Sequence, residues 1–262
     1  MLHYLIDEAL PGNKIPRVYS NTGIELMEIR KFVFNFKQKD ERFIILQPKN
    51  NIVKILKEYG YPFKSKMHSS WVKRFQKNGM NWAMHNYLQD EYATKKLYRP
   101  CPQILKYQFS EDFKLKISDL CYYLKEEPMI RYSKENNKPI FIDGIMREEG
   151  GRRAFSNCLS MDGDKVKSFH PLSPVSKDFE NWYIELRNIK LCCLYYEPYN
   201  FTRTGCKGCP FALDLQEELN TLQKFFPAER KQCEYIWKPV YDEYRRIGYR
   251  LPKDDDDKLF DW

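Results

Sequence analysis

Residues 15–60 read IPRVYSNTGIELMEIRKFVFNFKQKDERFIILQPKNNIVKILKEYG. This stretch contains two short apolar runs, at 15–20 and 43–46, which are typical of strands. Each run is followed by a segment with helical periodicity, at 24–36 and 51–59. The order strand, helix, strand, helix is that of βαβ units, which build a parallel sheet. This stretch therefore predicts an α/β fold.

The segments on either side extend the pattern with more helices and one more strand. We expect helices at 2–10, 177–187, 211–225 and 228–247, a mostly helical basic stretch at 65–96 and a strand at 139–146. The predicted architecture is an open, mostly parallel sheet flanked by helices, followed by a Cys-rich helical part. We expect the α/β core over 1–150 and the Cys-rich part over 151–262, packed as one unit.

The charge balance points to an anionic partner. The 262 residues include 44 Lys and Arg against 36 Asp and Glu, a net charge of +8. This excess favours a nucleotide, RNA or an acidic protein surface. The opening MLHYLIDEAL lacks the cationic run of a secretory signal, and no apolar segment reaches the roughly 20 residues that span a bilayer. We therefore expect a soluble cytoplasmic protein without a membrane role.

The strongest local motif is TRTGCKGCPF, residues 202–211. Cys206 and Cys209 are two residues apart, so both thiolates can face one ion, and the adjacent glycines let the backbone curl around it. A C-x-x-C pair also occurs in redox dithiols and among buried thiols, but the neighbouring cysteines favour a metal here. Spacing alone does not choose the other ligands among Cys101, Cys121, Cys158, Cys192, Cys193 and Cys233.

A charged turn, GIMREEGGRR at 144–153, follows the predicted strand at 139–146. Ligands bind at the carboxyl ends of parallel strands, where the arginines at 147, 152 and 153 would be suited to grip a phosphate. The alternative, slightly favoured by the residues alone, is a solvated turn in which the arginines pair with Glu148 and Glu149.

Two further segments each allow two interpretations. SNTGIE at 20–25 offers backbone donors and a helix N-terminus to an anion, although Asn-Thr-Gly is more commonly only a turn with a cap. The stretch at 64–87 interleaves basic and aromatic residues, as nucleic-acid-binding proteins do. A pair of amphipathic helices with a solvated basic face is the favoured interpretation of that stretch.

Six segments together resemble one family. They are IPRVYSNTGIE (15–25), YGYPFKSK (59–66), ISDLCYYLK (117–125), PIFIDGIMREEGGRR (139–153), HPLSPVSKDFENWYI (170–184) and TRTGCKGCPF (202–211). In this order they resemble the phosphoadenosine phosphosulfate (PAPS) reductase-like branch of the adenine nucleotide alpha-hydrolase fold, especially its phage and mobile-element members. Each segment alone is weakly specific, and it is their order that carries the resemblance.

The resemblance implies an adenine nucleotide at the strand ends and a metal centre. The residues that match the family's nucleotide-side motifs are Asn21, Thr22, Gly23, Glu25, Ser65, Lys66, Gly144, Glu149, Arg153 and Arg203. Members with this cysteine pattern bind zinc or an iron–sulfur cluster, which makes Cys121, Cys158, Cys206 and Cys209 the implied ligands.

The sequence also departs from the family pattern. The family's first strand and its Ser-Gly-Gly-x-Asp-Ser phosphate loop are missing, and residues 1–10 resemble the helix that follows that loop. The Glu-Cys-Gly-Leu-His motif of the reductases is absent as well, and Cys233 in KQCEY is expected to pack instead. Gly150 and Val175 stand where the family often has Ser and Trp.

These departures lead to two functional hypotheses. The first is a catalytically impaired derivative that acts by binding a macromolecular partner, as a regulator or inhibitor such as a phage might encode. In that case a protein partner or a second copy would complete the sheet. The alternative is an active nucleotide-dependent enzyme of the PAPS reductase or ATP-pyrophosphatase type.

Overall fold

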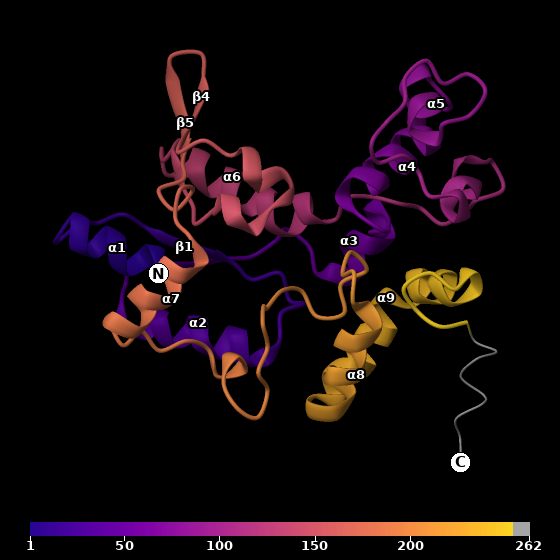
Figure 1. The fold of residues 1–262 in the computed structure, drawn as a ribbon. Coiled ribbons are helices and arrows are strands. Elements are labelled where there is room, and N and C mark those ends of the chain that lie inside the picture. The colour runs from indigo at the N-terminus through magenta and orange to yellow at the C-terminus, as the bar shows by residue number, and fades with distance from the viewer. Residues whose placement is uncertain (254–262) are drawn as a thin grey trace. The chain divides into compact units, whose positions relative to one another are not determined.

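A computed structural model describes residues 1–253, apart from the side chain of Arg152. Its fold is mixed α/β, with helices around two small sheets (Figure 1), as the sequence predicts. The chain forms two compact units. Unit 1 comprises Met1–Asn21, Met27–Gln47 and Glu126–Arg203, and unit 2 comprises Thr22–Leu26, Pro48–Lys125 and the chain from Thr204 onward.

Unit 1 begins with the predicted βαβ pattern. Its first elements are α1 (Leu2–Ala9), β1 (Arg17–Ser20), α2 (Met27–Lys39) and β2 (Phe43–Leu46). Strands β1 and β2 pair in parallel over their full length, from Arg17 opposite Phe43 to Ser20 opposite Leu46. The parallel pairing predicted from the first 60 residues is therefore confirmed, and Asn51, the expected start of the next helix, is the N-cap of α3.

The second sheet of unit 1 has the strand order β3-β5-β4. This part contains α6 (Glu127–Glu135), β3 (Phe141–Ile142), the 3₁₀ turns η3 (Arg147–Glu149) and η4 (Gly151–Phe155), β4 (Leu159–Asp162), β5 (Lys165–Phe169), α7 (Lys177–Leu186) and η5 (Cys193–Tyr195). β3 and β5 are parallel, whereas β4 and β5 form an antiparallel hairpin that projects from the unit (Figure 1). The expected elements do not include this hairpin.

The strand expected over 139–146 is much shorter than predicted. It is confined to Phe141–Ile142, because the Asp143 carboxylate accepts a hydrogen bond from the Ile145 amide (3.2 Å) and turns the chain. The helix expected at 177–187 forms as predicted, with the Ser176 hydroxyl accepting from the Phe179 amide.

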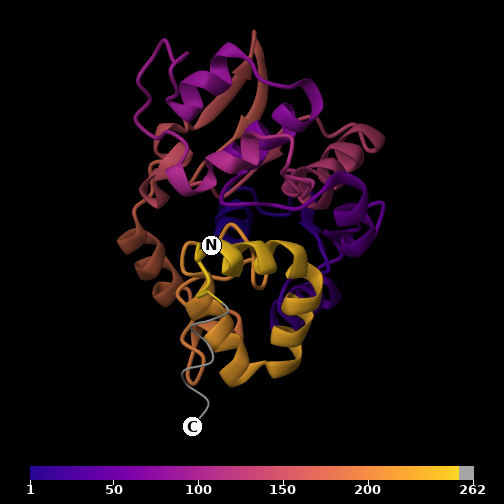
Figure 2. The same cartoon turned by 90° about the vertical axis from the view of Figure 1, so that its right-hand side faces the viewer.

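Unit 2 is largely helical. It contains α3 (Ile52–Tyr59), α4 (Lys66–Asn78), α5 (Trp82–Leu88), η1 (Gln103–Phe109), α8 (Leu215–Phe225) and α9 (Pro227–Ile247). A π-helical turn, η2 (Tyr122–Glu126), begins in unit 2 and ends at the first residue of the next segment of unit 1. α8 packs against α9 in the C-terminal part of the chain (Figure 2). The large side chains that are buried here include Phe63, Tyr87, Trp237, Tyr241 and Tyr244.

The described helices all lie within residues 1–253. No helix in that range has both the length and the apolar composition needed to cross a bilayer.

Candidate functional site

The loop that carries Cys206 and Cys209 is fixed by donors from α9. Three aromatic side chains of that helix donate to three loop carbonyls: the Trp237 indole to Lys207 (3.2 Å), the Tyr241 hydroxyl to Gly208 (2.5 Å) and the Tyr244 hydroxyl to Pro210 (2.7 Å). All three aromatic side chains are buried. Helix α9 therefore fixes the conformation of the C-x-x-C loop.

Gly208 is required by this close approach. Its φ is +56°, and a Cβ atom at this position would lie 2.5 Å from the Tyr241 hydroxyl and 2.8 Å from the Cys233 sulfur. Gly205, the other glycine of the motif, has nothing within 4 Å of its Cβ position. Of the two glycines, Gly208 is thus the one that lets the loop pack against α9.

The turn of the SNTGIE motif lies directly beside this loop. Glu25 and Cys206 form an antiparallel β-bridge, and the Lys207 amide donates to the Ile24 carbonyl (2.8 Å). Within the turn, the Thr22 hydroxyl donates to Oε1 of Glu25 (2.6 Å). Oε2 of Glu25 is buried and has no hydrogen-bond partner among the described protein groups. A buried carboxylate oxygen without a donor is a position at which a bound ligand can supply one.

Three cysteines of unit 2 interact electrostatically. Burial raises the pKa of Cys121 to about 11 and that of Cys209 to about 12, and the neighbouring Cys206 thiol adds to both shifts. Burial also raises the pKa of Cys206, although the Lys125 ammonium and the Thr22 hydroxyl favour its thiolate. These thiols share one environment, in which a cation would stabilise their ionised forms.

The three thiols of unit 2 are close enough to affect one another's pKa, but their sulfur atoms do not form one tight group. Within residues 1–253, the sulfurs of Cys121, Cys206 and Cys209 do not all lie within 4.8 Å of one another. Cys158, the fourth implied ligand, belongs to unit 1 and is exposed. The donor chemistry fits a thiophilic metal, because three thiols and a hydrogen-bonding Lys125 gather in one unit.

A hydrogen-bonded chain supports the backbone at Cys158. The His170 amide donates to the Cys158 carbonyl (2.7 Å). The His170 ring lies between two polar side chains, with Nδ1 2.6 Å from the Asp143 carboxylate and Nε2 2.9 Å from the Ser168 hydroxyl. His170 is buried, so these contacts hold its ring and the adjacent strand end in place.

The implied nucleotide-side residues are divided between the units. Asn21, Gly144, Glu149, Arg153 and Arg203 belong to unit 1, whereas Thr22, Gly23, Glu25, Ser65 and Lys66 belong to unit 2. The Ser65 hydroxyl caps α4 by accepting from the His68 amide (3.2 Å). Lys66, the first residue of α4, lies near enough to Cys121 to lower that thiol's pKa against the larger effect of burial.

The charged turn after β3 is a solvated ion-pair cluster in this structure. Arg153 pairs with Glu149 at 2.7 Å, and both side chains are about half exposed. The Arg147 guanidinium donates to the Ser156 carbonyl (2.8 Å). The side chain of Arg152 lies outside the described part of the structure. This geometry matches the solvated-turn interpretation, although an exposed ion pair such as this costs little to open.

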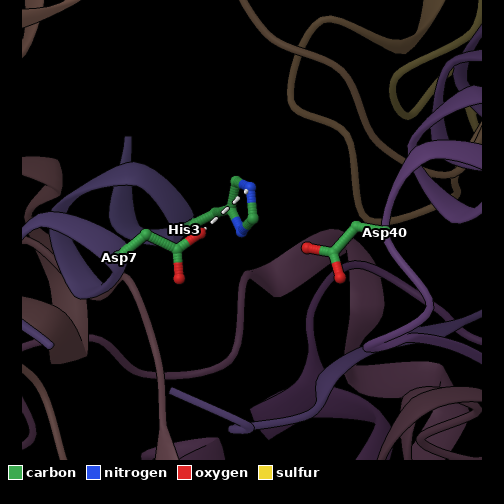
Figure 3. A group of neighbouring side chains, drawn as sticks. All are labelled: His3, Asp7 and Asp40. Carbon is green, nitrogen blue, oxygen red and sulfur yellow. Dashed lines mark ion pairs between the residues drawn. The ribbon is translucent and has the colours of Figure 1, made fainter. Parts of the chain in front are cut away.

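A second cluster of metal-ligand types lies in unit 1. His3, Asp7 and Asp40 each place a ligand atom within 4.8 Å of the others, and Figure 3 shows the two carboxylates pointing toward the His3 ring. However, both carboxylates already form ion pairs with arginines. Arg42 contacts Asp7 at 2.6 Å and Asp40 at 2.7 Å, and Arg17 contacts Asp7 at 2.8 Å. Two guanidinium groups balance the two carboxylates, so the cluster is an ion-pair network.

Sequence reasoning missed Lys125. Its side chain hydrogen-bonds to Cys206 and interacts with Cys121 and Glu25, although burial opposes its charge. The available signal was its position four residues after Cys121, a spacing that places two residues on one face of a helix. The contribution of α9 was also missed, because nothing in the sequence of that helix identifies which carbonyls its aromatic groups will meet.

Two comparisons with known proteins bear on the site. The profile of the phosphoadenosine phosphosulfate reductase domain matches residues 80–212. The match covers half of the chain and includes the C-x-x-C loop and the cysteines at 121 and 158. No curated protein matches the sequence significantly.

Proposed function

The chain belongs to the phosphoadenosine phosphosulfate reductase domain family, and we propose that it is a binding protein of that family built around a thiolate metal centre. The ligands proposed within unit 2 are Cys121, Cys206 and Cys209, and the family resemblance implies Cys158 as the fourth. The observation that carries the proposal is the clustering of three thiols with Lys125 in unit 2. In that position the metal would cross-link the C-x-x-C loop to the chain at Cys121.

The metal is zinc or an iron–sulfur cluster. Thiolates on one zinc ion, with Zn–S bonds of about 2.3 Å, lie roughly 4 Å apart. The three sulfurs do not all come within 4.8 Å, and a cluster, which binds its thiolates through different irons, accommodates a wider spacing more readily. With its thiolate ligands, either group would have a net negative charge, which the Lys125 ammonium would offset.

An absorption spectrum and a zinc assay test this metal centre. Protein purified without oxygen should be coloured and should bleach in air, or should be colourless and release zinc to an indicator dye when an organomercurial is added. Folded protein that is colourless and releases no zinc would overturn the proposal.

An adenine nucleotide is the proposed small ligand. In unit 2 it would meet Thr22, Gly23, Glu25, Ser65 and Lys66. The support from geometry is the unpartnered Oε2 of Glu25, which suits a ligand hydroxyl or amino donor. Lys66 adds a cation at the start of α4 for a phosphate.

Binding, rather than reduction, is the proposed activity. Cys233, the cysteine nearest the C-terminus, is fully buried in α9, and burial raises its pKa to about 12. A thiol of this kind is a poor nucleophile. We propose that the protein acts in the cytoplasm as a regulator or inhibitor of a macromolecular partner. In this proposal, a partner protein or a second copy would complete an open, mostly parallel sheet.

Calorimetry combined with a turnover assay tests this activity. Titration with ATP, AMP and PAPS should give micromolar binding of at least one nucleotide, reduced at least 10-fold by Lys66→Ala and unchanged by the exposed control Lys165→Ala. Purified protein should release neither sulfite nor pyrophosphate. No binding of any of the three would refute the nucleotide site, and sustained turnover would establish the active-enzyme alternative.

A further inference from the structure

Almost all of the net positive charge of the chain lies in one segment. Residues 64–106 contain nine Lys and Arg and two acids, a net charge of +7, whereas the whole chain has a net charge of +8. The rest of the molecule is therefore close to neutral. A field concentrated in this way attracts a polyanion to one surface rather than to the protein as a whole.

The segment has a small buried core, and most of its basic side chains are exposed around that core. The His68 ring lies between the Tyr87 hydroxyl (2.9 Å) and the Gln108 carbonyl oxygen (2.7 Å), and all three side chains are buried. This core ties α4, α5 and η1 together. Seven basic residues remain exposed around it: Lys66, Lys73, Arg74, Lys77, Lys95, Lys96 and Arg99.

Large aromatic side chains are exposed among these charges. Tyr98 is 94% exposed, Trp82 is 69% exposed and Tyr92 is 65% exposed. The Arg99 guanidinium lies over the Tyr98 ring at 5.7 Å. Tyr92 also lies against the His85 ring, with the ring centroids 5.1 Å apart. All three aromatic side chains leave most of their surface exposed next to cations, where they offer flat faces for stacking.

The loop after α5 is held in a defined conformation. The buried Asn86 side chain accepts hydrogen bonds from the amides of Thr94 (2.7 Å) and Lys95 (2.8 Å). At the other end, the Cys101 amide donates to the Tyr87 carbonyl (2.7 Å). The residues between these anchors, Lys95 to Arg99, are thus presented from fixed ends, which lowers the entropic cost of binding.

We propose that this surface binds single-stranded nucleic acid. The basic–aromatic surface consists of α4, α5 and the loop 89–100, with its cations on the phosphates and Trp82, Tyr92 and Tyr98 stacked on unpaired bases. The proposal rests on the proposed function only in naming the macromolecular partner. An acidic protein would satisfy the cations but would not supply a flat ring beside each negative charge.

Fluorescence anisotropy with labelled single-stranded RNA and DNA 20-mers, repeated across salt concentrations, tests the proposal. Tyr98→Ala should weaken binding about 5- to 150-fold, the range for loss of one stacked base. Lys95→Glu with Lys96→Glu should weaken binding and flatten the slope of log Kd against log salt by about 1.4, since two phosphate contacts are lost.

Matched controls lie elsewhere on the surface. Tyr235→Ala removes a tyrosine that is 73% exposed in α9, and Lys165→Glu with Lys167→Glu reverses two exposed lysines of β5. Both should bind the 20-mers as the unaltered protein does. Equal weakening by these controls would show unspecific charge attraction and would overturn the proposal.

Competition separates the remaining outcomes. Excess poly-glutamate should displace the 20-mers far less effectively than unlabelled RNA does. Equal displacement, together with no effect of Tyr98→Ala, would assign the surface to an acidic protein and refute the proposal. No binding by protein that contains its metal would refute this inference and leave the proposed metal centre intact.

Discussion

His68 shows how one buried residue ties the stability of unit 2 to pH. Its ring is fully buried, and burial lowers its pKa to about 4, although the hydrogen bond to Gln108 opposes this shift. In the unfolded chain the pKa returns to about 6.5. Between these values the unfolded state binds a proton that the folded state does not, so acid favours unfolding over that interval.

The expected result is a loss of stability that depends on His68. As the pH falls from 7 to 4, the free energy of unfolding should drop by roughly 3 kcal/mol more in the unaltered protein than in His68→Gln. Urea unfolding at several pH values measures this difference. Val72→Ala, in the same helix, should cost the same at pH 7 and pH 4. A His68→Gln curve parallel to that of the unaltered protein would contradict the account.

Gly208 makes a second prediction at the scale of one residue. Gly208→Ala should lower the free energy of unfolding by roughly 2–4 kcal/mol, because a Cβ there both strains a positive φ and collides with Tyr241 and Cys233. Gly205→Ala, with nothing within 4 Å of its Cβ position, should be nearly neutral. Thermal unfolding followed by circular dichroism compares them, and equal losses would show that the loop does not pack on α9 as described.

At the scale of elements, one buried ion pair joins the C-x-x-C loop to α9. The Lys207 ammonium pairs with the Glu229 carboxylate and also donates to the Gln232 side chain (2.7 Å). The Lys207 side chain is only 5% exposed. Removing a partner from a buried charge costs more than removing one from a surface pair.

Glu229→Ala should therefore destabilise the protein by about 3 kcal/mol, the lower end for an uncompensated buried charge. Asp242→Ala breaks an exposed pair with Lys238 on the same helix and should cost less than about 1 kcal/mol. Urea unfolding of both variants provides the measurement. Comparable costs would indicate that Lys207 finds another partner or reaches water.

Element by element, the sequence was informative where the local pattern dominates. The strand at 43–46 and the cap at Ser176 follow from an apolar run and a Ser before a helix. The β4–β5 hairpin was missed because its strands are only four and five residues long, so the alternation of Leu159 and Met161 with polar residues is too short to stand out. Its two-residue turn, Gly163-Asp164, was the available signal.

At the scale of the whole molecule, the site depends on segments that are distant in the sequence. Glu25 pairs with Cys206 across about 180 residues, and neither periodicity nor spacing can place two such segments together. The resemblance to the PAPS reductase family grouped them, and the domain match over 80–212 supports that family. One continuous open sheet and a division near residue 150 stay predictions, since the described strands form two small sheets.

Elemental analysis of protein purified without oxygen probes the proposed thiolate metal centre. We expect bound zinc or iron in the unaltered protein, its loss in Cys121→Ser, Cys206→Ser and Cys209→Ser, and its retention in Cys101→Ser, which alters a buried cysteine outside the cluster. Folded protein with neither metal, or equal loss of metal in Cys101→Ser, would refute the metal centre.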